Sequence, residues 1–234
     1  MLLRRAGVDI QRFPGESQEY LSMRTLVSAE PDLVLDVGAH HGQFVLDARA
    51  AGCNAAAVSF EPGSEAYALL SGRARSLPSW SAVRAAVGKN PGIASLNVAG
   101  NAGASSSLLP MLALHEAAAP DATYIGTEPV EVVRLDDWLH HNRPLARRLA
   151  VKIDCQGTEQ SVLEGLDKRL ADVVWLRVEL SIRPLYEGSW NWLTASRWLT
   201  EQGFHVVGLL PGFGDPSTGE MLQFDGVFTR EARL

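Results

Sequence analysis

A glycine turn follows a hydrophobic run near the start of the chain. The segment Leu33 to Val37 reads as a buried strand, and Gly38 and Gly42 follow it at a spacing that leaves the backbone open to a ligand. Glu61 stands about 20 residues further on, after a second hydrophobic run, where a carboxylate can accept hydrogen bonds from both hydroxyls of a ribose. This pattern predicts a site for an adenosine-containing cofactor. A purely structural turn between strand and helix is the alternative.

Charged side chains interrupt two other hydrophobic runs. Lys152 and Asp154 share one face of a predicted strand because side chains alternate along it, and Arg177 and Glu179 repeat the pattern on the next strand. Unpaired charges inside central strands would be costly to bury, so we expect an ionic cluster near the carboxyl ends, where open α/β sheets bind ligands. Structural bridges, Lys152 with Glu179 or Arg177 with Asp154, are the alternative to a catalytic role.

Alternating strands and helices are expected to position these residues. Glycine, proline and capping residues mark where these elements begin and end. They predict strands at 33–37, 55–60, 81–87, 130–135, 149–153, 173–180, 204–210 and 222–229. The predicted helices are 42–51, 65–75, 160–170 and 192–203, with a short helix capped by Asp136 and Asp137. The last two strands have no helix between them, which favours antiparallel pairing. The fold class is therefore α/β.

One region departs from this rhythm. The turn Lys89-Asn90-Pro91-Gly92 predicts that 93–98 forms a hairpin with 81–87. Residues 99–127 are rich in Gly, Ala and Ser and contain one expected helix near 108–118, which suggests an insertion over the cofactor site. We expect an N-terminal extension at 1–30 and one domain at 31–234, with the insertion near 93–135.

Composition sets further bounds. The chain has 234 residues, is 46% hydrophobic and carries a net charge of -6, which fits one domain with a sizeable core. No apolar run approaches the roughly 18 residues of a membrane span, and Met1 to Asp9 is not followed by the apolar core of a signal peptide, so we expect a cytoplasmic protein. Without a basic stripe, nucleic acid is not an expected partner. Cys53 and Cys155 fit no disulfide or metal motif and are expected to be reduced.

An ordered set of motifs resembles the FkbM family of methyltransferases over about Leu33 to Arg230. The set is Asp36-Val37-Gly38-Ala39, Phe60-Glu61-Pro62, Ala86-Val87-Gly88, Ser106-Ser107-Leu108, Lys152-Ile153-Asp154-x-Gln156-Gly157-x-Glu159, Glu179-Leu180 and Pro184-Leu185-Tyr186. The resemblance implies a class I methyltransferase fold, Rossmann-like, with a mostly parallel seven-stranded sheet that ends in an antiparallel hairpin. It also implies S-adenosylmethionine as cofactor, S-adenosylhomocysteine as product, and O-methylation of a hydroxyl on a sugar or natural product.

Residue chemistry suggests separate roles at such a site, because a sulfonium cofactor with an α-amino acid group needs carboxylates, glycine backbone and an apolar slot for adenine. By position, Asp36 would face the methionine end of the cofactor, Gly38 would let the backbone approach it and Glu61 would hold the ribose. His40 stands where the family usually has Asn. The full cofactor-binding set is Asp36, Gly38, His40, Gly42, Glu61, Pro62, Ala86, Ser107 and Asp154, and the catalytic set is Asp154, Glu179 and Lys152.

Each assignment has a plainer alternative. Asp36 could cap the first helix, Glu61 could be a solvated loop acid, and His40 a surface residue. Asp154 is the candidate general base, although a histidine could serve, and Mg²⁺ held by Asp154 and Glu179 is possible but not favoured. Trp190, Trp192 and Trp198 could stack on a sugar but more often such residues are core.

Two other functions stay open. A nicotinamide-dependent Rossmann oxidoreductase is disfavoured because the turn lacks the middle glycine of Gly-x-Gly-x-x-Gly. A non-catalytic, methyltransferase-like binding domain is the second, and His40 is the hint for it. The expected partner is a small-molecule or glycan acceptor, with no membrane and a possible homo-oligomer.

Overall fold

A computed structural model of the chain describes residues 17–230. The segment Met1 to Asp9 and the first sixteen residues of the predicted extension 1–30 lie outside the described residues. Within the described range, no helix combines the length and the apolar character that a membrane crossing requires.

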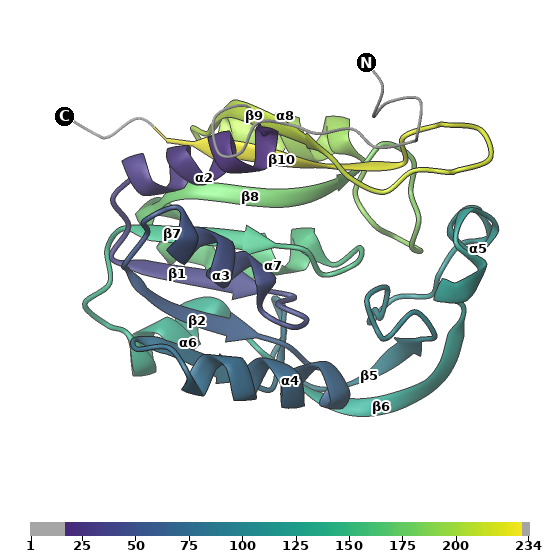
Figure 1. The fold of residues 1–234 in the computed structure, drawn as a ribbon, viewed down its shortest axis with the longest axis horizontal. Coiled ribbons are helices and arrows are strands. Elements are labelled where there is room, and N and C mark those ends of the chain that lie inside the picture. Colours follow the sequence, from purple (N-terminus) through teal and green to yellow (C-terminus); the bar gives the residue numbers. More distant parts are fainter. Residues whose placement is uncertain (1–16, 231–234) are drawn as a thin grey trace, which may run out of the picture.

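A seven-stranded sheet forms the centre of the molecule (Figure 1). Only β10 runs opposite to the other six strands of this sheet, so the predicted class I fold with its antiparallel C-terminal hairpin is confirmed. In spatial order the strands are β3 (Trp80–Val83), β2 (Ala56–Phe60), β1 (Leu33–Val37), β7 (Leu149–Ile153), β8 (Val173–Ser181), β10 (Gln223–Thr229) and β9 (His205–Pro211).

Helices cover both faces of this sheet because its central strands are apolar on both sides. In β1, Leu33, Leu35 and Val37 belong to the core cluster beneath one helical layer, and Val34 belongs to the cluster beneath the other. The first layer is α6 (Leu135–Asn142), α7 (Glu159–Leu166) and α8 (Trp192–Glu201). The second is α2 (Gln18–Ser28), α3 (Gln43–Ala50) and α4 (Ser64–Arg75). By alternation, Asp36 points toward the second layer.

A separate three-stranded sheet corrects two predictions. It is ordered β4 (Ala86–Val87), β6 (Tyr124–Val133), β5 (Gly92–Ala99). The predicted strand 81–87 is broken at 84–85, so β3 joins the large sheet and β4 the small one. The predicted hairpin of 93–98 on 81–87 is wrong, because β6 lies between them and pairs with both. β6 also begins earlier than the predicted strand 130–135.

Residues 100–119, here called the cover segment, cross from the small sheet toward the loop that follows β8 (Figure 1). Within it, α5 (Ala113–Ala118) is shorter than the predicted helix at 108–118, because 110–112 is extended and pairs with 185–187. Leu112 donates its N–H to Leu185 O at 2.9 Å, and Glu187 donates to Pro110 O at 2.9 Å. The predicted helix 160–170 also ends early, because α7 gives way to a 3₁₀ helix, η2 (Asp167–Asp172). A second 3₁₀ helix, η1 (Pro120–Ala122), follows α5.

Candidate functional site

A row of polar residues crosses four adjacent strands of the large sheet. Ser59 in β2, Asp36 in β1, Lys152 in β7 and Arg177 in β8 occupy successive positions of one register. They lie on the face covered by α2 to α4, and in β1, β2 and β7 they are the only polar residues of their strands. The predicted ionic cluster is therefore present, near the carboxyl ends of β1 and β7.

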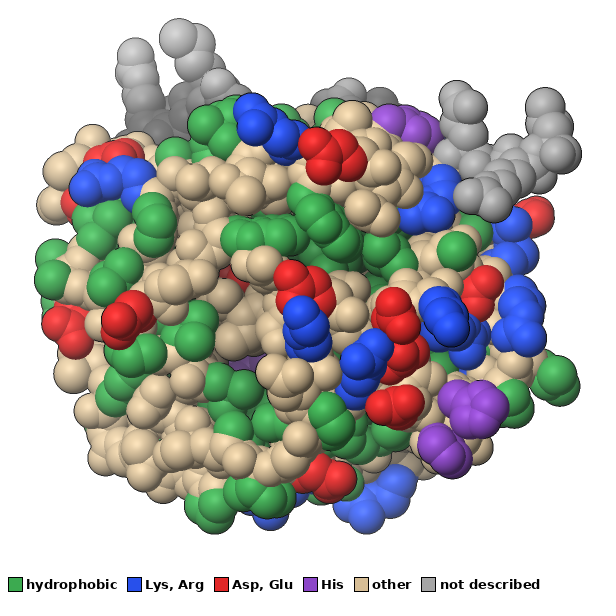
Figure 2. Space-filling view, turned by 180° about the vertical axis from the view of Figure 1, so that it is seen from behind, with side chains coloured by type: hydrophobic (Ala, Val, Ile, Leu, Met, Phe, Trp, Pro, Cys, Tyr) green, Lys and Arg blue, Asp and Glu red, His purple; other side chains and the backbone are tan. Residues whose placement is uncertain are grey.

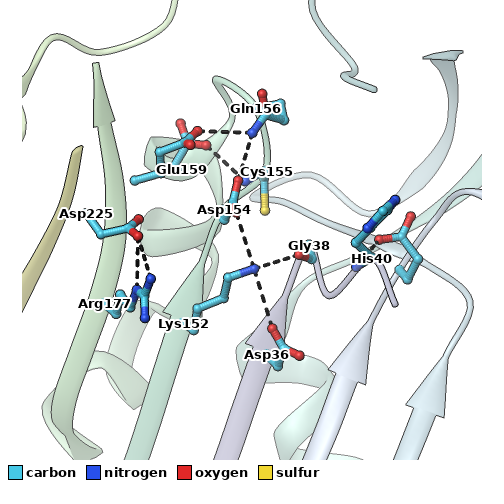
Figure 3. A network of polar contacts seen from close by, with 12 residues as sticks. Asp36, Gly38, His40, Lys152, Asp154, Cys155, Gln156, Glu159, Arg177 and Asp225 are labelled. Atoms are coloured by element: carbon cyan, nitrogen blue, oxygen red, sulfur yellow. Dashed lines mark hydrogen bonds and ion pairs between the residues drawn. The ribbon is translucent and has the colours of Figure 1, made fainter. Parts of the chain in front are cut away.

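Lys152 is the centre of this row (Figure 3). Its ammonium group donates to the Gly38 carbonyl at 2.6 Å and lies 3.5 Å from Asp36 Oδ1 and 3.6 Å from Asp154 Oδ2. Burial alone would lower the pKa of Lys152, but the carboxylates of Asp154 and Asp36 outweigh it and hold that pKa above its usual range. Lys152 is thus a fixed cation and not a proton acceptor.

Asp36 is fully enclosed beneath the glycine turn. Ser59 Oγ donates to Asp36 Oδ2 at 3.0 Å, and Trp80 Nε1 in turn donates to Ser59 Oγ at 2.9 Å. Burial raises the pKa of Asp36, while Lys152 and Ser59 act in the opposite direction. Asp36 lines neither of the two cavities described below, so its place in the fold is that of a support for Lys152.

Arg177 pairs with acids that the sequence did not indicate. It donates to Asp225 Oδ2 from Nε at 3.1 Å and from Nη2 at 2.7 Å, and it contacts Glu19 from α2. The alternative of a structural bridge, Lys152 with Glu179 or Arg177 with Asp154, does not form, because Lys152 pairs with Asp36 and Asp154 and Arg177 with Asp225 and Glu19. Strand alternation specifies the face on which a charge lies but not its partner.

Glu61 is held at the end of β2 by backbone donors. His40 N–H donates to Oε2 at 2.7 Å and Gly63 N–H donates to Oε1 at 2.8 Å. Burial raises the pKa of this carboxyl, and the two backbone bonds oppose that shift. Each carboxylate oxygen retains acceptor capacity toward the neighbouring cavity. The plainer alternative of a solvated loop acid does not fit a side chain that is 9% exposed.

His40 has a left-handed backbone, at φ +47°, that points its N–H at Glu61. Its ring reaches the cover segment, with Nε2 3.0 Å from Ala102 O, and stacks on His41 at 3.7 Å between centroids. His40 therefore contributes its backbone to Glu61 and its side chain to the cover.

The two predicted glycines have different roles. Gly38 has φ +71°, and a Cβ there would lie 1.7 Å from Asp154 O, so the turn after β1 and the loop after β7 touch through backbone alone. Gly42 has φ +82°, and a Cβ there would meet Trp80 and Leu70 side chains at 2.6–2.7 Å. Gly42 serves packing and does not line a cavity.

Gln156, in the loop after β7, contacts two acids. Its Nε2 donates to Asp154 Oδ1 at 2.8 Å and to Glu179 Oε2 at 3.1 Å, so its amide stands between the two carboxylates. Burial, followed by the charges of Asp154 and Glu159, raises the pKa of Glu179 well above its ordinary value. Glu159 Oε1 accepts from Cys155 N and Gly157 N at 3.0 Å, and burial raises the pKa of Glu159 to about 7.

The contacts of Gln156 affect whether Asp154 and Glu179 could share a divalent ion. The amide of Gln156 occupies the space between Asp154 and Glu179 that a shared cation would need. Among residues 17–230, no group of three or more His, Cys, Asp or Glu side chains is arranged to hold a metal.

Two cavities meet at the glycine turn and share Gly38, His40 and Asp154 as walls. The first measures about 180 Å³. It is closed on one side by the cover segment and lined by the apolar side chains Pro62, Ala86, Val87, Leu96 and Leu108 together with Glu61, Ser107, Cys155, Gln156 and Thr158. Seen from behind, the surface is recessed toward the side of the cover segment, with an acidic and a histidine side chain visible at depth (Figure 2).

The second cavity measures about 430 Å³ and carries charges of both signs. Its cationic side chains are Arg73, Lys152 and Arg177, and its acids, besides Asp154, are Glu19 and Asp47.

Most of the predicted site residues therefore come together. The first cavity is lined by Gly38, His40, Glu61, Pro62, Ala86, Ser107 and Asp154, and the second adds Lys152. Asp36, Gly42 and Glu179 do not reach either cavity. Sequence reasoning assigned no role to Gln156 or Tyr186, although both stand in the motifs that carried the family resemblance.

The tryptophans lie away from both cavities. Trp190 and Trp198 pack against the core beneath α8, with 5.6 Å between ring centroids, and Trp192 is 37% exposed beside Phe224. Their placement matches the core alternative for Trp190 and Trp198.

Comparison with known proteins gives one family and a set of distant structures. A family profile described as "Methyltransferase FkbM domain" matches residues 36–206. A search of curated proteins found no match. An rRNA methylase from Streptococcus thermophilus aligns with a TM-score of 0.49 and 12% identity, over 95% of this chain and 99% of that one. A precorrin-6y C5,15-methyltransferase from Geobacter metallireducens gives 0.49 and 10%, over 96% and 94%. A magnesium protoporphyrin IX methyltransferase from Synechocystis, solved with its methyl donor bound, gives 0.46 and 11%, over 97% and 89%.

Proposed function

Because the chain belongs to the FkbM family of S-adenosylmethionine-dependent methyltransferases, we propose that it methylates a hydroxyl oxygen of a sugar or natural-product acceptor. The carrying observation is Glu61, fixed by two backbone donors in the wall of a cavity at the carboxyl edge of the sheet. The choice of oxygen as the methylated atom, and of the acceptor class, rests on the family resemblance.

The first cavity suits the adenosine half of the cofactor. Glu61 presents carboxylate oxygens to a ribose diol, and Pro62, Ala86 and Leu108 offer apolar surface to a purine. At about 180 Å³ this cavity is smaller than the roughly 300–1,000 Å³ typical of sites for whole drug-sized ligands. The rest of the cofactor would therefore extend past Gly38 into the second cavity.

The second cavity suits an α-amino acid. A zwitterion needs a cation for its carboxylate and an acid for its ammonium group, and Arg73 and Lys152 stand there with Glu19 and Asp47. Asp36, which was expected to face this end, would act from beneath by holding Lys152.

S-adenosylmethionine supplies an electrophilic methyl group on a sulfonium. The protein's part would be to align the acceptor, exclude water and take the hydroxyl proton. Asp154 is the proposed base because it stands where the two cavities meet and its side chain is 34% exposed. Lys152 would hold Asp154 and the Gly38 turn together, and Glu179 would act from behind through Gln156.

Cofactor binding is the first test. Calorimetric titrations with S-adenosylmethionine, S-adenosylhomocysteine and NAD⁺ are expected to show binding of the first two only. Glu61→Ala should weaken that binding at least about tenfold, as loss of charge-assisted hydrogen bonds predicts. Glu128→Ala is the matched control, since Glu128 also accepts a backbone N–H, from Ser64, but lines neither cavity.

The outcomes separate the alternatives. Tight NAD⁺ binding would support the oxidoreductase and overturn this proposal. Binding of S-adenosylmethionine without transfer of its labelled methyl to any member of a panel of sugars, polyketides and peptides with free hydroxyls would favour a non-catalytic domain. We further propose a small-molecule acceptor instead of nucleic acid or a membrane, and a cytoplasmic location.

A further inference from the structure

The amide of Gln156 makes one hydrogen bond to each of two carboxylates. Its Nε2 atom donates to Asp154 Oδ1 at 2.8 Å and to Glu179 Oε2 at 3.1 Å. An amide has a donor end and an acceptor end, and only the donor end can face two ionised carboxylates. With its donor end on both carboxylates, Gln156 therefore favours their charged forms, whereas the opposite orientation would favour a protonated carboxyl.

Tyr186 supplies the bond that sets this orientation. Its hydroxyl donates to Gln156 Oε1 at 2.6 Å, so the acceptor end of the amide is occupied away from the acids. The Tyr186 ring is fully buried and is fixed on two sides. Gly157 packs so closely that a Cβ there would lie 2.8 Å from Tyr186 Cβ, and His115 makes an edge contact at 5.2 Å between centroids.

The same tyrosine belongs to the contact between the cover segment and the site. Its hydroxyl lies 3.3 Å from Ser105 O, and its backbone bridges to Met111. Ser107 Oγ donates to the Gln156 carbonyl at 2.6 Å. Gln156 is thus held through its side chain by Tyr186 and through its backbone by the cover segment.

We propose that Tyr186 is a positioning residue whose hydroxyl, acting through Gln156, keeps the donor end of the amide on Asp154 and Glu179. Its importance for methyl transfer rests on the function proposed above, in which Asp154 accepts the acceptor's proton. Without the hydroxyl the amide is free to turn, and its oxygen would then accept a hydrogen bond from a protonated carboxyl. Glu179 would then keep its proton to a higher pH, and the donor contact that orients the Asp154 carboxylate would be lost.

Other groups around Glu179 also affect its pKa in the wild-type protein. Asp154, Glu159 and Asp225 face Glu179 as like charges, Lys152 faces it as an opposite charge, and Gln223 Nε2 donates to Glu179 Oε2 at 2.7 Å. None of these contacts involves the Tyr186 hydroxyl, so its removal tests the orientation of Gln156 separately.

The test is a carboxyl titration of the ligand-free protein. The ¹³C carboxyl signal of Glu179 is followed by NMR across pH in the wild type, Tyr186→Phe and Tyr124→Phe. The apparent pKa of Glu179 is expected to rise by about one unit in Tyr186→Phe. Tyr124→Phe is the matched control, because its hydroxyl donates to Leu109 O at 2.8 Å in the same region without touching Gln156.

A second variant tests whether Tyr186 acts through Gln156. Gln156→Met removes the amide and should raise the apparent pKa of Glu179 by itself, and adding Tyr186→Phe should then change nothing further. This variant also carries the test should Tyr186→Phe fail to fold. A wild-type titration in Tyr186→Phe, or additive shifts in the double variant, would overturn the proposal.

Titrations with S-adenosylhomocysteine keep the two proposals apart. If the wild type fails to bind it, the proposed function fails, and the ligand-free carboxyl titration still decides the role of Tyr186. If the wild type binds it and the titration is unchanged, the positioning role fails alone.

Discussion

The ammonium group of Lys152 donates a hydrogen bond to the backbone carbonyl of Gly38 across 2.6 Å, from β7 to the turn that follows β1. This bond joins the charged row in the sheet to the glycine turn at the cavity wall. The position of the turn therefore depends on a cation that is itself held by two carboxylates, Asp36 and Asp154.

Replacing that cation should cost stability. Lys152→Met leaves Asp36 fully buried without its counter-charge, and removal of one partner of a buried pair costs about 3–5 kcal/mol of unfolding free energy. Adding Asp36→Asn should recover part of that loss. Urea unfolding at neutral pH measures both, and Lys89→Met, which breaks an exposed bridge to Glu164, should change the free energy by less than about 1 kcal/mol. Equal losses in Lys152→Met and Lys89→Met would contradict this account.

Gly38→Ala should abolish cofactor binding, because it adds a steric clash to the strain of a positive φ. The added methyl would overlap Asp154 O at 1.7 Å, so the β1 and β7 loops must separate. Gly52→Ala is the control, because Gly52 also has a positive φ, +101°, but a Cβ there meets nothing within 4 Å. We expect Gly52→Ala to cost about 1–2 kcal/mol and to keep cofactor binding, and Gly38→Ala to lose it. Circular dichroism and calorimetry distinguish unfolding from loss of binding; retained affinity in Gly38→Ala would refute the prediction.

The buried carboxyl of Glu159 should make stability fall as pH rises. Its pKa is about 7 in the folded protein against an ordinary 4.5, so the protonated form is favoured by folding. The associated stability is fully present below pH 4.5 and is lost between 4.5 and about 7, up to about 3 kcal/mol. Glu159→Gln should therefore flatten the unfolding free energy in that window. Ser161 lies in the same helix as Glu159, and its hydroxyl accepts a hydrogen bond from Lys89 N. Ser161→Ala should therefore lower the unfolding free energy at every pH without changing its slope against pH. An unchanged slope in Glu159→Gln would argue against this assignment.

His40→Asn should speed exchange of the cofactor. Asparagine tolerates the left-handed backbone at this position, so the N–H bond to Glu61 would persist, while the ring contact with Ala102 O would be lost. We expect S-adenosylhomocysteine to associate and dissociate faster with a similar dissociation constant, as measured by stopped-flow fluorescence. His40→Ala, in which the left-handed conformation is less favourable, should bind more weakly as well. Slower release in His40→Asn would show that the ring does not restrain the cover segment.

The local sequence pattern was sufficient to predict the strands and turns that meet at the site. Alternation along β7 placed Lys152 on one face, and the spacing from Gly38 to Glu61 placed both at the carboxyl edge of the sheet. These are short-range properties of a strand and of a strand-helix-strand unit, which is why the fold class and the first cavity could be predicted.

Pairing over long distances could not be predicted in the same way. The turn at 89–92 marks where a strand ends but carries no information about β6, which begins more than thirty residues later and takes both neighbours. The partner of Arg177 depends on β10, which is remote in sequence and adjacent only after the hairpin has formed. Gln156 and Tyr186 have meaning only once the cover segment is in place.

The row from Ser59 through Asp36 and Lys152 to Arg177 also guards against misassembly during folding. A one-residue slip of β7 against β1 would turn Lys152 to the opposite helical layer and leave Asp36 facing an aliphatic side chain. Parallel strands made of Val, Leu, Ile and Ala offer many nearly equivalent alignments. A charge that finds its partner in one alignment alone disfavours the others, so we expect this row to narrow the choice of register among these strands.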